Sequence, residues 1–170
     1  MSNPSSLVPN PSQDLWANWL LECRPGGRLS IFEPINSYGW PEPPDRFMQL
    51  DVTPVQDIAA KAKAGYEAAM GGAGRSMIDF DERDLVRYAD QAGFAEIHLE
   101  FLIDIQPASP MPWDTYLNTA FNPCAPTLNE LFDETLAAAE HARFTAHLRR
   151  QFESPDRRWS SAFAYLRAVR

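Results

Sequence analysis

The amino-acid sequence predicts an α/β domain in which three strands are separated by helices. Three segments carry this prediction: Arg28–Glu33 after a Pro-Gly-Gly turn, Ala95–Ile105 with alternating apolar side chains, and Trp159–Val169 at the C-terminal end. Helical patterns and helix-capping residues lie between them. A chain of 170 residues can bury about 70% of the surface that it exposes when unfolded, which suits one domain.

The first predicted strand lies close to the start of the chain. Residues 1–11 are rich in Ser, Asn and Pro, and we expect a disordered tail there. Ser12 can cap a helix that ends before Pro25, because proline disfavours the helical conformation of the residue before it. A Gly-Gly pair then turns the chain into the strand Arg28–Glu33. A buried strand of this kind normally has a neighbour on each side, and the preceding segment is too short to supply one.

Two helices between the first and second strands have clear boundary signals. The segment Thr53–Gln56 combines an N-cap residue, a proline at the first helical position and a glutamine three residues after the cap. This helix should run to about Met70. Asp81 caps the second helix, and Gly93 is its expected left-handed end. Apolar side chains gather on one side of this second helix, which is its predicted inner side.

The other two strands differ in pattern. In Ala95–Ile105 apolar residues alternate with acidic residues and a histidine, which predicts one buried and one solvated face. Residues 107–154 have helical patterns that prolines interrupt, and Trp113–Phe121 is one predicted helix among them. Trp159–Val169 is apolar almost throughout. Apolar residues on both sides of a terminal strand predict that it is inserted between two others.

Composition and charge exclude several classes of function. The net charge of -8 argues against a nucleic-acid partner, which needs concentrated positive charge. The sequence has no apolar run of transmembrane length and no signal-peptide pattern, so we expect a cytoplasmic protein without a membrane partner. Cys23 and Cys124 lie far apart, and reduced thiols are expected. His141 and His147 are six residues apart, a poor spacing for a shared ion, and no metal is predicted.

Three short motifs in this order of elements resemble the C-terminal half of the class I S-adenosylmethionine-dependent methyltransferases. In that family a helix commonly ends in "LxPGG" before the fifth strand, and Leu21–Gly27 matches it here. A later "F-x-x-x-x-L…AGF" segment precedes the sixth strand, and Phe80–Leu85 with Ala92–Phe94 match it. The resemblance extends over about Leu15–Arg170. Another α/β protein with a Pro-Gly-Gly turn is the alternative.

The resemblance implies an incomplete Rossmann-like three-layer sandwich. It would be the C-terminal half of a class I methyltransferase sheet with an exposed central edge. This half-domain would occupy residues 12–170, with helical lid insertions at about 36–78 and 107–156. The last strand would return antiparallel between the fifth and sixth strands of the family fold.

The half of the family fold that binds the cofactor has no counterpart in this sequence. The family uses a glycine-rich turn after the first strand, an acidic residue after the second and contacts before the fourth. Nothing before Arg28 is long enough for even one strand–helix unit. We therefore expect S-adenosyl-L-methionine to be bound only through a partner chain.

The same topology would leave the strand Arg28–Glu33 with one bare edge. Unpaired N–H and C=O groups on an edge strand are a template for pairing with another chain. Three outcomes are open. A protein partner supplies the missing strands, a second copy pairs edge to edge, or the chain is a fragment of marginal stability.

Four residues near the end of the first strand form the candidate site: Glu33, Asn36, Tyr38 and Trp40. The resemblance implies that this end of the strand faces the substrate side of a pocket. A carboxylate at Glu33 could take a proton from the acceptor or orient it, and a structural capping role is equally open. Tyr38 and Trp40 could stack on a flat acceptor or bracket a methyl-sulfonium group, with packing in a lid as the alternative. No catalytic residue is assigned.

Two functions follow from these expectations. In the first, the chain is the acceptor-side subunit of a split or heteromeric methyltransferase that acts on a small molecule, and is an enzyme only when a partner completes it. In the second, it is a non-catalytic methyltransferase-like binding or regulatory protein that forms a homodimer through its open sheet edge.

Overall fold

The computed structural model describes residues 23–75, 78–121 and 125–170 of the chain. The predicted disordered tail, the helix predicted to begin at Ser12 and the thiol of Cys124 lie outside the described residues. None of the helices in the described ranges is long and apolar enough to cross a membrane.

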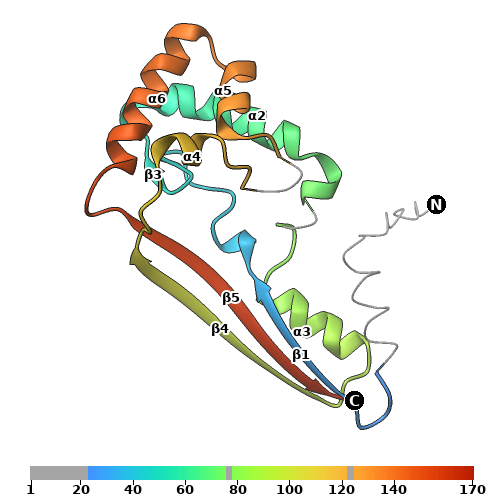
Figure 1. Ribbon diagram of the computed structural model, residues 1–170. Coiled ribbons are helices and arrows are strands. Elements are labelled where there is room, and N and C mark those ends of the chain that lie inside the picture. The colour runs from blue at the N-terminus through green and yellow to red at the C-terminus, as the bar shows by residue number, and fades with distance from the viewer. Residues whose placement is uncertain (1–22, 76–77, 122–124) are drawn as a thin grey trace, which may run out of the picture.

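Three strands form the main sheet in the order β1-β5-β4 (Figure 1). Their bounds are β1 (Arg28–Pro34), β4 (Glu96–Pro107) and β5 (Arg158–Val169). The C-terminal strand β5 is antiparallel to both neighbours, and Leu166 lies opposite Ile31 of β1 and Leu99 of β4. The predicted insertion of the C-terminal strand between the other two is confirmed.

One face of the sheet packs against the helix α3 (Glu82–Gln91). Leu166 and the alanines at every second position of β5 are buried there, together with Leu85 and Phe94. We call this cluster the sheet core. The small side chains in the middle of β5 let the helix approach the strands closely.

Both ends of α3 lie where the sequence predicted them. The carboxylate of Asp81 accepts hydrogen bonds from the N–H groups of Arg83 (2.9 Å) and Asp84 (3.0 Å), and the carboxylate of Asp84 accepts one from the N–H of Asp81 (3.1 Å). These bonds satisfy N–H groups that a helix start leaves unpaired. Gly93 follows the helix with a φ of 80°, the left-handed conformation that favours glycine.

The predicted burial of one face of β4 is wrong for its second half. Ile97 and Leu99 are half-buried, whereas Ile103 and Ile105 are 48% and 53% exposed. The cause is length. The 10 residues of α3 span about 15 Å, whereas the 12 residues of β4 span about 40 Å, so one short helix cannot cover the whole strand.

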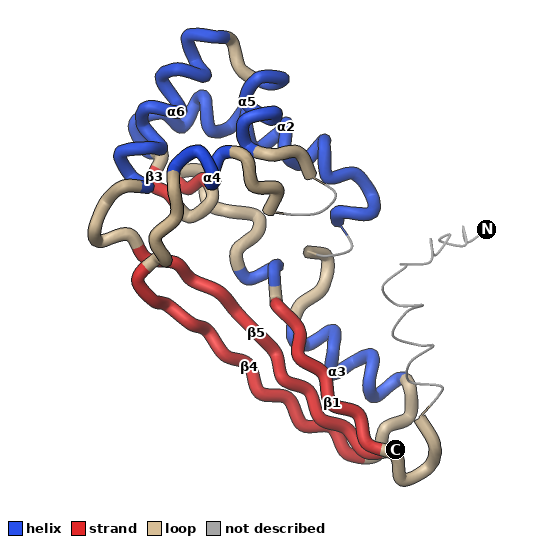
Figure 2. The backbone as a smooth tube through the Cα atoms, in the orientation of Figure 1, coloured by secondary structure: helices blue, strands red, loops and turns tan. Residues whose placement is uncertain are grey.

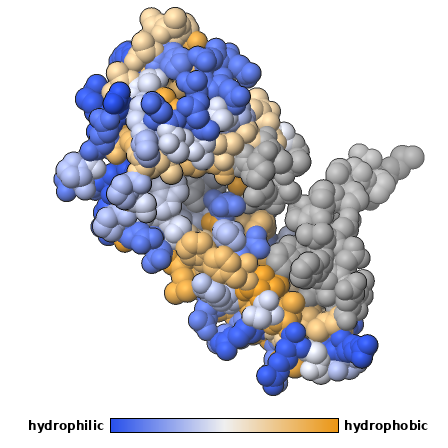
Figure 3. All heavy atoms as spheres, in the orientation of Figure 1, coloured by the Kyte–Doolittle hydropathy of each residue, from blue (hydrophilic) through white to orange (hydrophobic). Residues whose placement is uncertain are grey.

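The opposite face of the sheet carries exposed aromatic side chains. Phe32 stacks on Phe163 with ring centroids 5.3 Å apart and lies 5.0 Å from the ring of Tyr165. Phe32 is 52% exposed and Leu102 of β4 is 49% exposed. Figure 3 shows apolar surface over the sheet below the helical part of the molecule. The two-sided apolarity of β5 is thus not matched by burial on both sides in the described part of the chain.

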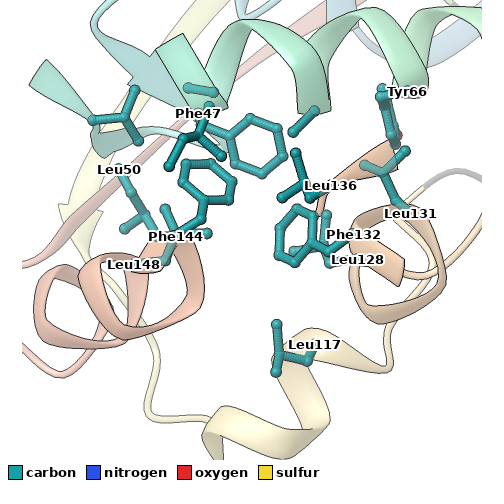
Figure 4. Packing of buried hydrophobic residues seen from close by; sticks show 14 of the residues in the cluster. Phe47, Leu50, Tyr66, Leu117, Leu128, Leu131, Phe132, Leu136, Phe144 and Leu148 are labelled. Atoms are coloured by element: carbon teal, nitrogen blue, oxygen red, sulfur yellow. The ribbon is translucent and has the colours of Figure 1, made fainter. Parts of the chain in front are cut away.

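The two predicted lid insertions pack together into one helical body at one end of the sheet (Figure 2). Its elements are η1 (Asn36–Tyr38), β2 (Arg46–Phe47), β3 (Leu50–Asp51), η2 (Thr53–Val55), α2 (Gln56–Arg75), α4 (Trp113–Leu117), α5 (Leu128–Thr135) and α6 (Ala138–Phe152). The helical body has a core of its own (Figure 4). In that core the ring of Phe47 lies 5.8 Å from Phe132 and 5.3 Å from Phe144.

Two local predictions in the helical body need correction. The helix α2 begins at the predicted place, but Thr53 does not cap it, because its hydroxyl donates to the carboxylate of Asp51 (2.7 Å). The helix predicted from Trp113 ends at Leu117 rather than at residue 121. The hairpin of β2 and β3 was not predicted. The predicted break after Met70 is confirmed, since Gly71 has non-helical dihedral angles within α2.

The outer edge of β1 pairs with no strand among the described residues. Hydrogen bonds join Ile35 N–H to the Ala162 carbonyl (2.9 Å) and Arg170 N–H to the Gly27 carbonyl (3.0 Å). Because bonded residues alternate along an antiparallel pair, the N–H and C=O groups of Arg28, Ser30 and Phe32 point away from β5. Their side chains lie on the aromatic face.

The described chain is therefore a mixed α/β fold with a small antiparallel sheet. α3 covers one face of this sheet, and no described helix buries the aromatic face. The three-layer Rossmann-like arrangement that the resemblance implied is not seen within the described ranges.

Candidate functional site

A pocket of about 250 Å³ lies where the carboxyl end of β1 meets the start of β5 and the helical body. The sheet contributes Pro34 and Ser160 to its wall, and the helical body contributes Tyr66 from α2. The chain passes from the sheet into the helical body at η1, which begins two residues after Pro34 at the end of β1. The pocket is thus bounded by segments from the first, middle and last parts of the sequence.

Three of the four predicted site residues line this pocket: Asn36, Tyr38 and Trp40. Asn36 and Tyr38 belong to η1, and Trp40 follows it. The hydroxyl of Ser37 donates to the Phe80 carbonyl (2.7 Å) and ties η1 to the segment before α3. This bond fixes the short helix against the segment before α3, and Asn36 and Tyr38 on either side of Ser37 line the pocket.

The aromatic side chains at the pocket come from both parts of the molecule. The ring of Trp40 lies 5.5 Å from that of Tyr66, tilted by 56°. Tyr38 is 43% exposed and meets Phe101 of β4 edge to face at 6.5 Å. Trp40 therefore forms a part of the pocket wall that packs on Tyr66 of the helical body, whereas Tyr38 packs on Phe101 of the sheet and stays accessible to a ligand.

Glu33 is separated from the other predicted residues. It lies opposite Ala164 on the helix-covered face of the sheet and is not among the described residues that line the pocket. Partial burial raises the pKa of its carboxyl group. The alternation of side chains along β1 explains this position, because Glu33 shares a face with Ile31 rather than with Phe32.

Sequence reasoning missed a carboxylate at this site. Glu42 lines the pocket and accepts hydrogen bonds from the N–H groups of Met48 (2.7 Å) and Gln49 (2.6 Å). Burial raises its pKa, while these two N–H groups, Lys63 and Arg46 act in the opposite direction. The sequence offered only a weak signal for Glu42. Glu42 is the acidic residue nearest to Trp40 in a proline-rich loop, and only the fold brings it to the pocket.

A second cavity of about 220 Å³ adjoins the first and shares Phe121 and Trp159 with it. Tyr116 lines this cavity, and its buried hydroxyl has no hydrogen-bond partner among the described residues. Burial raises the pKa of this phenol. Arg157, directly before β5, lines the same cavity, and its guanidinium lies 4.1 Å from the ring centroid of Phe152.

Comparisons with known proteins add nothing to this geometry. The chain matches no family model, no curated protein and no solved structure.

One feature of nucleotide-like cofactor sites is not seen in residues 23–75, 78–121 and 125–170. A nucleotide-like cofactor in an α/β sheet sits beside a glycine-rich turn that leads from a strand into a helix. Among the described residues, no such turn follows β1, β4 or β5. Within the same ranges, His, Cys, Asp and Glu side chains form no group of three that would suit a metal ion. What the pocket offers is an aromatic wall with one oriented carboxylate, which suits binding and positioning of a small molecule.

Proposed function

We propose that this chain is the acceptor-side subunit of a heteromeric S-adenosylmethionine-dependent methyltransferase that acts on a small molecule. A partner chain would supply the strands and glycine-rich turn that hold the cofactor. The observation that carries the proposal is the position of β5, antiparallel between β1 and β4, with the pocket at the carboxyl end of β1. This is the strand arrangement that the resemblance implied for the last three strands of the family fold.

The open edge of β1 supports the need for a partner. The outward groups of Arg28, Ser30 and Phe32 form a short row that a parallel or antiparallel strand can extend. The exposed ring of Phe32 lies beside this edge, together with the rings of Phe163 and Tyr165. A partner that pairs with β1 would also bury this aromatic surface. At about 25 cal/mol per Å² of apolar area, such burial adds substantially to the main-chain hydrogen bonds.

The chemistry assigned to this chain is binding and orientation. Holding two reactants in a productive geometry can contribute about 7–11 kcal/mol to the lowering of a barrier, without any group that reacts covalently. Tyr38 and Trp40 would contact the flat or apolar part of the acceptor, and Asn36 would contact its polar part. Glu33 has no role in this proposal, because it does not line the pocket.

Co-expression with the neighbouring reading frame tests the proposal. Size-exclusion chromatography with light scattering gives the mass of this chain alone and with the neighbour, and calorimetry measures the binding of S-adenosylmethionine by each sample. We expect a complex of the two chains that binds the cofactor, and no binding by this chain alone. Tight binding by the isolated chain would overturn the proposal. A stable homodimer that ignores the neighbour would favour the non-catalytic alternative instead.

A further inference from the structure

The carboxylate of Glu42 is held in a fixed orientation inside the pocket. Each of its two oxygens accepts one backbone N–H, from Met48 at 2.7 Å and from Gln49 at 2.6 Å. These donors belong to the two-residue turn of the β2–β3 hairpin. The loop that carries Glu42 and the hairpin are therefore locked to each other through this one side chain.

The turn that supplies these N–H groups has an uncommon conformation. Met48 has a φ of 47° and Gln49 a φ of 65°, so both are in the left-handed region without being glycine or asparagine. A backbone in such a region persists only where its surroundings determine it, and such residues concentrate at functional sites. Here the conformation aims two successive N–H groups at one carboxylate in a pocket wall.

Glu42 has no cationic partner within ion-pair distance among the described residues. Lys63 and Arg46 lower the pKa of this carboxyl group from beyond that distance, and the ammonium group of Lys63 donates to the carbonyl oxygens of Pro43 (2.6 Å) and of Glu42 itself (3.4 Å) rather than to the carboxylate. A partly desolvated carboxylate gains when a cation approaches its remaining lone pairs. The two backbone N–H groups orient the charge without neutralising it.

The rest of the pocket wall suits an organic cation. Tyr38, Trp40 and Tyr66 bring three electron-rich rings to the same pocket as Glu42. The face of an aromatic ring attracts ammonium groups, most strongly for Trp and Tyr and where water is excluded. The volume of about 250 Å³ limits the ligand to a small one.

We propose that this pocket binds a small organic amine in its ammonium form, with Glu42 as the counter-ion and the Tyr38, Trp40 and Tyr66 rings as the surrounding wall. The inference deepens the proposed function by naming the ligand class of the same pocket, and it rests on that function only for the ligand's role as acceptor. Binding itself needs neither the cofactor nor a partner chain.

A two-dimensional ¹H–¹⁵N NMR titration of the chain alone tests the inference. The probes are phenethylammonium and 2-phenylethanol, which have the same carbon skeleton and differ in charge. We expect the ammonium compound to bind at least about tenfold more tightly than the alcohol, with the largest shifts at the amides of Met48 and Gln49. Equal affinities, or shifts located away from the pocket, would overturn the inference.

Variants separate the charge of Glu42 from its structural role. Glu42→Gln should bring the two affinities within about twofold of each other, whereas Glu67→Gln on the exposed surface of α2 should leave the tenfold preference unchanged. A preference that survives Glu42→Gln in a folded variant would overturn the assignment. If thermal unfolding shows that this variant does not fold, the comparison of the two probes on the natural sequence decides alone. Failure here would leave partner-dependent cofactor binding intact, so the two proposals fail separately.

Discussion

Gln49 joins the helical body to the sheet through three hydrogen bonds to Ser160. Its side-chain oxygen accepts from the N–H (2.8 Å) and the hydroxyl (3.0 Å) of Ser160, and its amide nitrogen donates to the Ser160 carbonyl (2.9 Å). Ser160 lies near the start of β5, and Gln49 lies in the left-handed turn of the hairpin. One side chain therefore fixes the relative position of two pocket walls.

Shortening this side chain should loosen the connection. Gln49→Asn keeps the amide chemistry and suits the left-handed backbone, but one methylene fewer removes its reach to Ser160. We expect a loss of about 1–3 kcal/mol in the free energy of unfolding, because half-buried polar groups of Ser160 lose their partners. Urea unfolding measures this loss. Gln91→Asn at the exposed end of α3 is the control, and an equal loss in both variants would contradict the role of Gln49.

Any side chain in place of Gly65 should destabilise the protein, because this position of α2 faces α5. A Cβ atom at this position would clash with the Cγ2 atom of Thr135 and would lie 3.2 Å from a methyl group of Leu131. Gly65→Ala should therefore destabilise the protein by about 1–3 kcal/mol, although alanine is the better helix former by about 1 kcal/mol. Thermal and urea unfolding measure the change.

A substitution of Thr135, the residue that Gly65 faces, provides the control. Thr135→Ser removes the clashing methyl group and keeps the hydroxyl that donates to the Leu131 carbonyl (2.6 Å). The double variant Gly65→Ala with Thr135→Ser should recover most of the stability that Gly65→Ala loses. If the stability changes of the two single variants simply add up in the double variant, the two helices do not meet at this point.

The strand order and the caps of α3 could be predicted because each depends on local sequence. The apolar run in β5 predicted a strand between two others, although the face that carries Tyr165 is exposed, and Asp81 with Gly93 supplied both ends of α3. The helical body depends on contacts between segments that are distant in sequence. The approach of α2 to α5 at Gly65 is an example, since a single glycine within a helical pattern does not show which helix packs against it.

The pocket was predicted only in part for the same reason. Tyr38 and Trp40 were found because the resemblance implied that the end of this strand faces a pocket, and both residues line the pocket of the structure. The turn at Met48 and Gln49 could not be found, because two-residue hairpins usually show Asn-Gly or Asp-Gly at these positions. The position of Glu42 depends on that turn, so it could not be predicted either.

The stability of the protein should depend on pH through Glu33. Desolvation raises the pKa of this carboxyl group in the folded state above its ordinary value near 4.5. The folded state therefore holds the proton more tightly than the unfolded state, and the stability from this group is present at low pH and lost as the pH rises through the raised pKa. Glu33→Gln removes the charge and keeps the shape. It should be more stable than the natural sequence at pH 7, with a difference that shrinks toward pH 4.

Thermal unfolding of both proteins between pH 4 and pH 8 measures this effect. Glu67→Gln at an exposed position controls for the substitution itself. A Glu33→Gln variant that is less stable at pH 7 would mean that the carboxylate makes a favourable contact that outweighs its desolvation.

Proline substitutions in β1 should separate strand pairing from folding. The N–H of Ser30 points to the open edge, whereas that of Ile31 points to Leu166 of β5. Proline has no N–H, and in sheets it is tolerated where the missing group faces outward on an edge strand. Ser30→Pro should therefore keep the fold but prevent any further strand from pairing with β1. Ile31→Pro should destabilise the fold, by about 1–3 kcal/mol for the unpaired Leu166 carbonyl alone.

Light scattering and circular dichroism measure association and folding of the two variants. If a partner or a second copy binds at the edge of β1, the natural sequence associates and Ser30→Pro is a folded monomer under the same conditions. The row of outward groups is only three residues long, and Pro34 already ends it, so one added proline in its middle leaves no two adjacent bonding positions. Association that survives Ser30→Pro would place the interface elsewhere, with the exposed aromatic face around Phe32 as the next surface to vary.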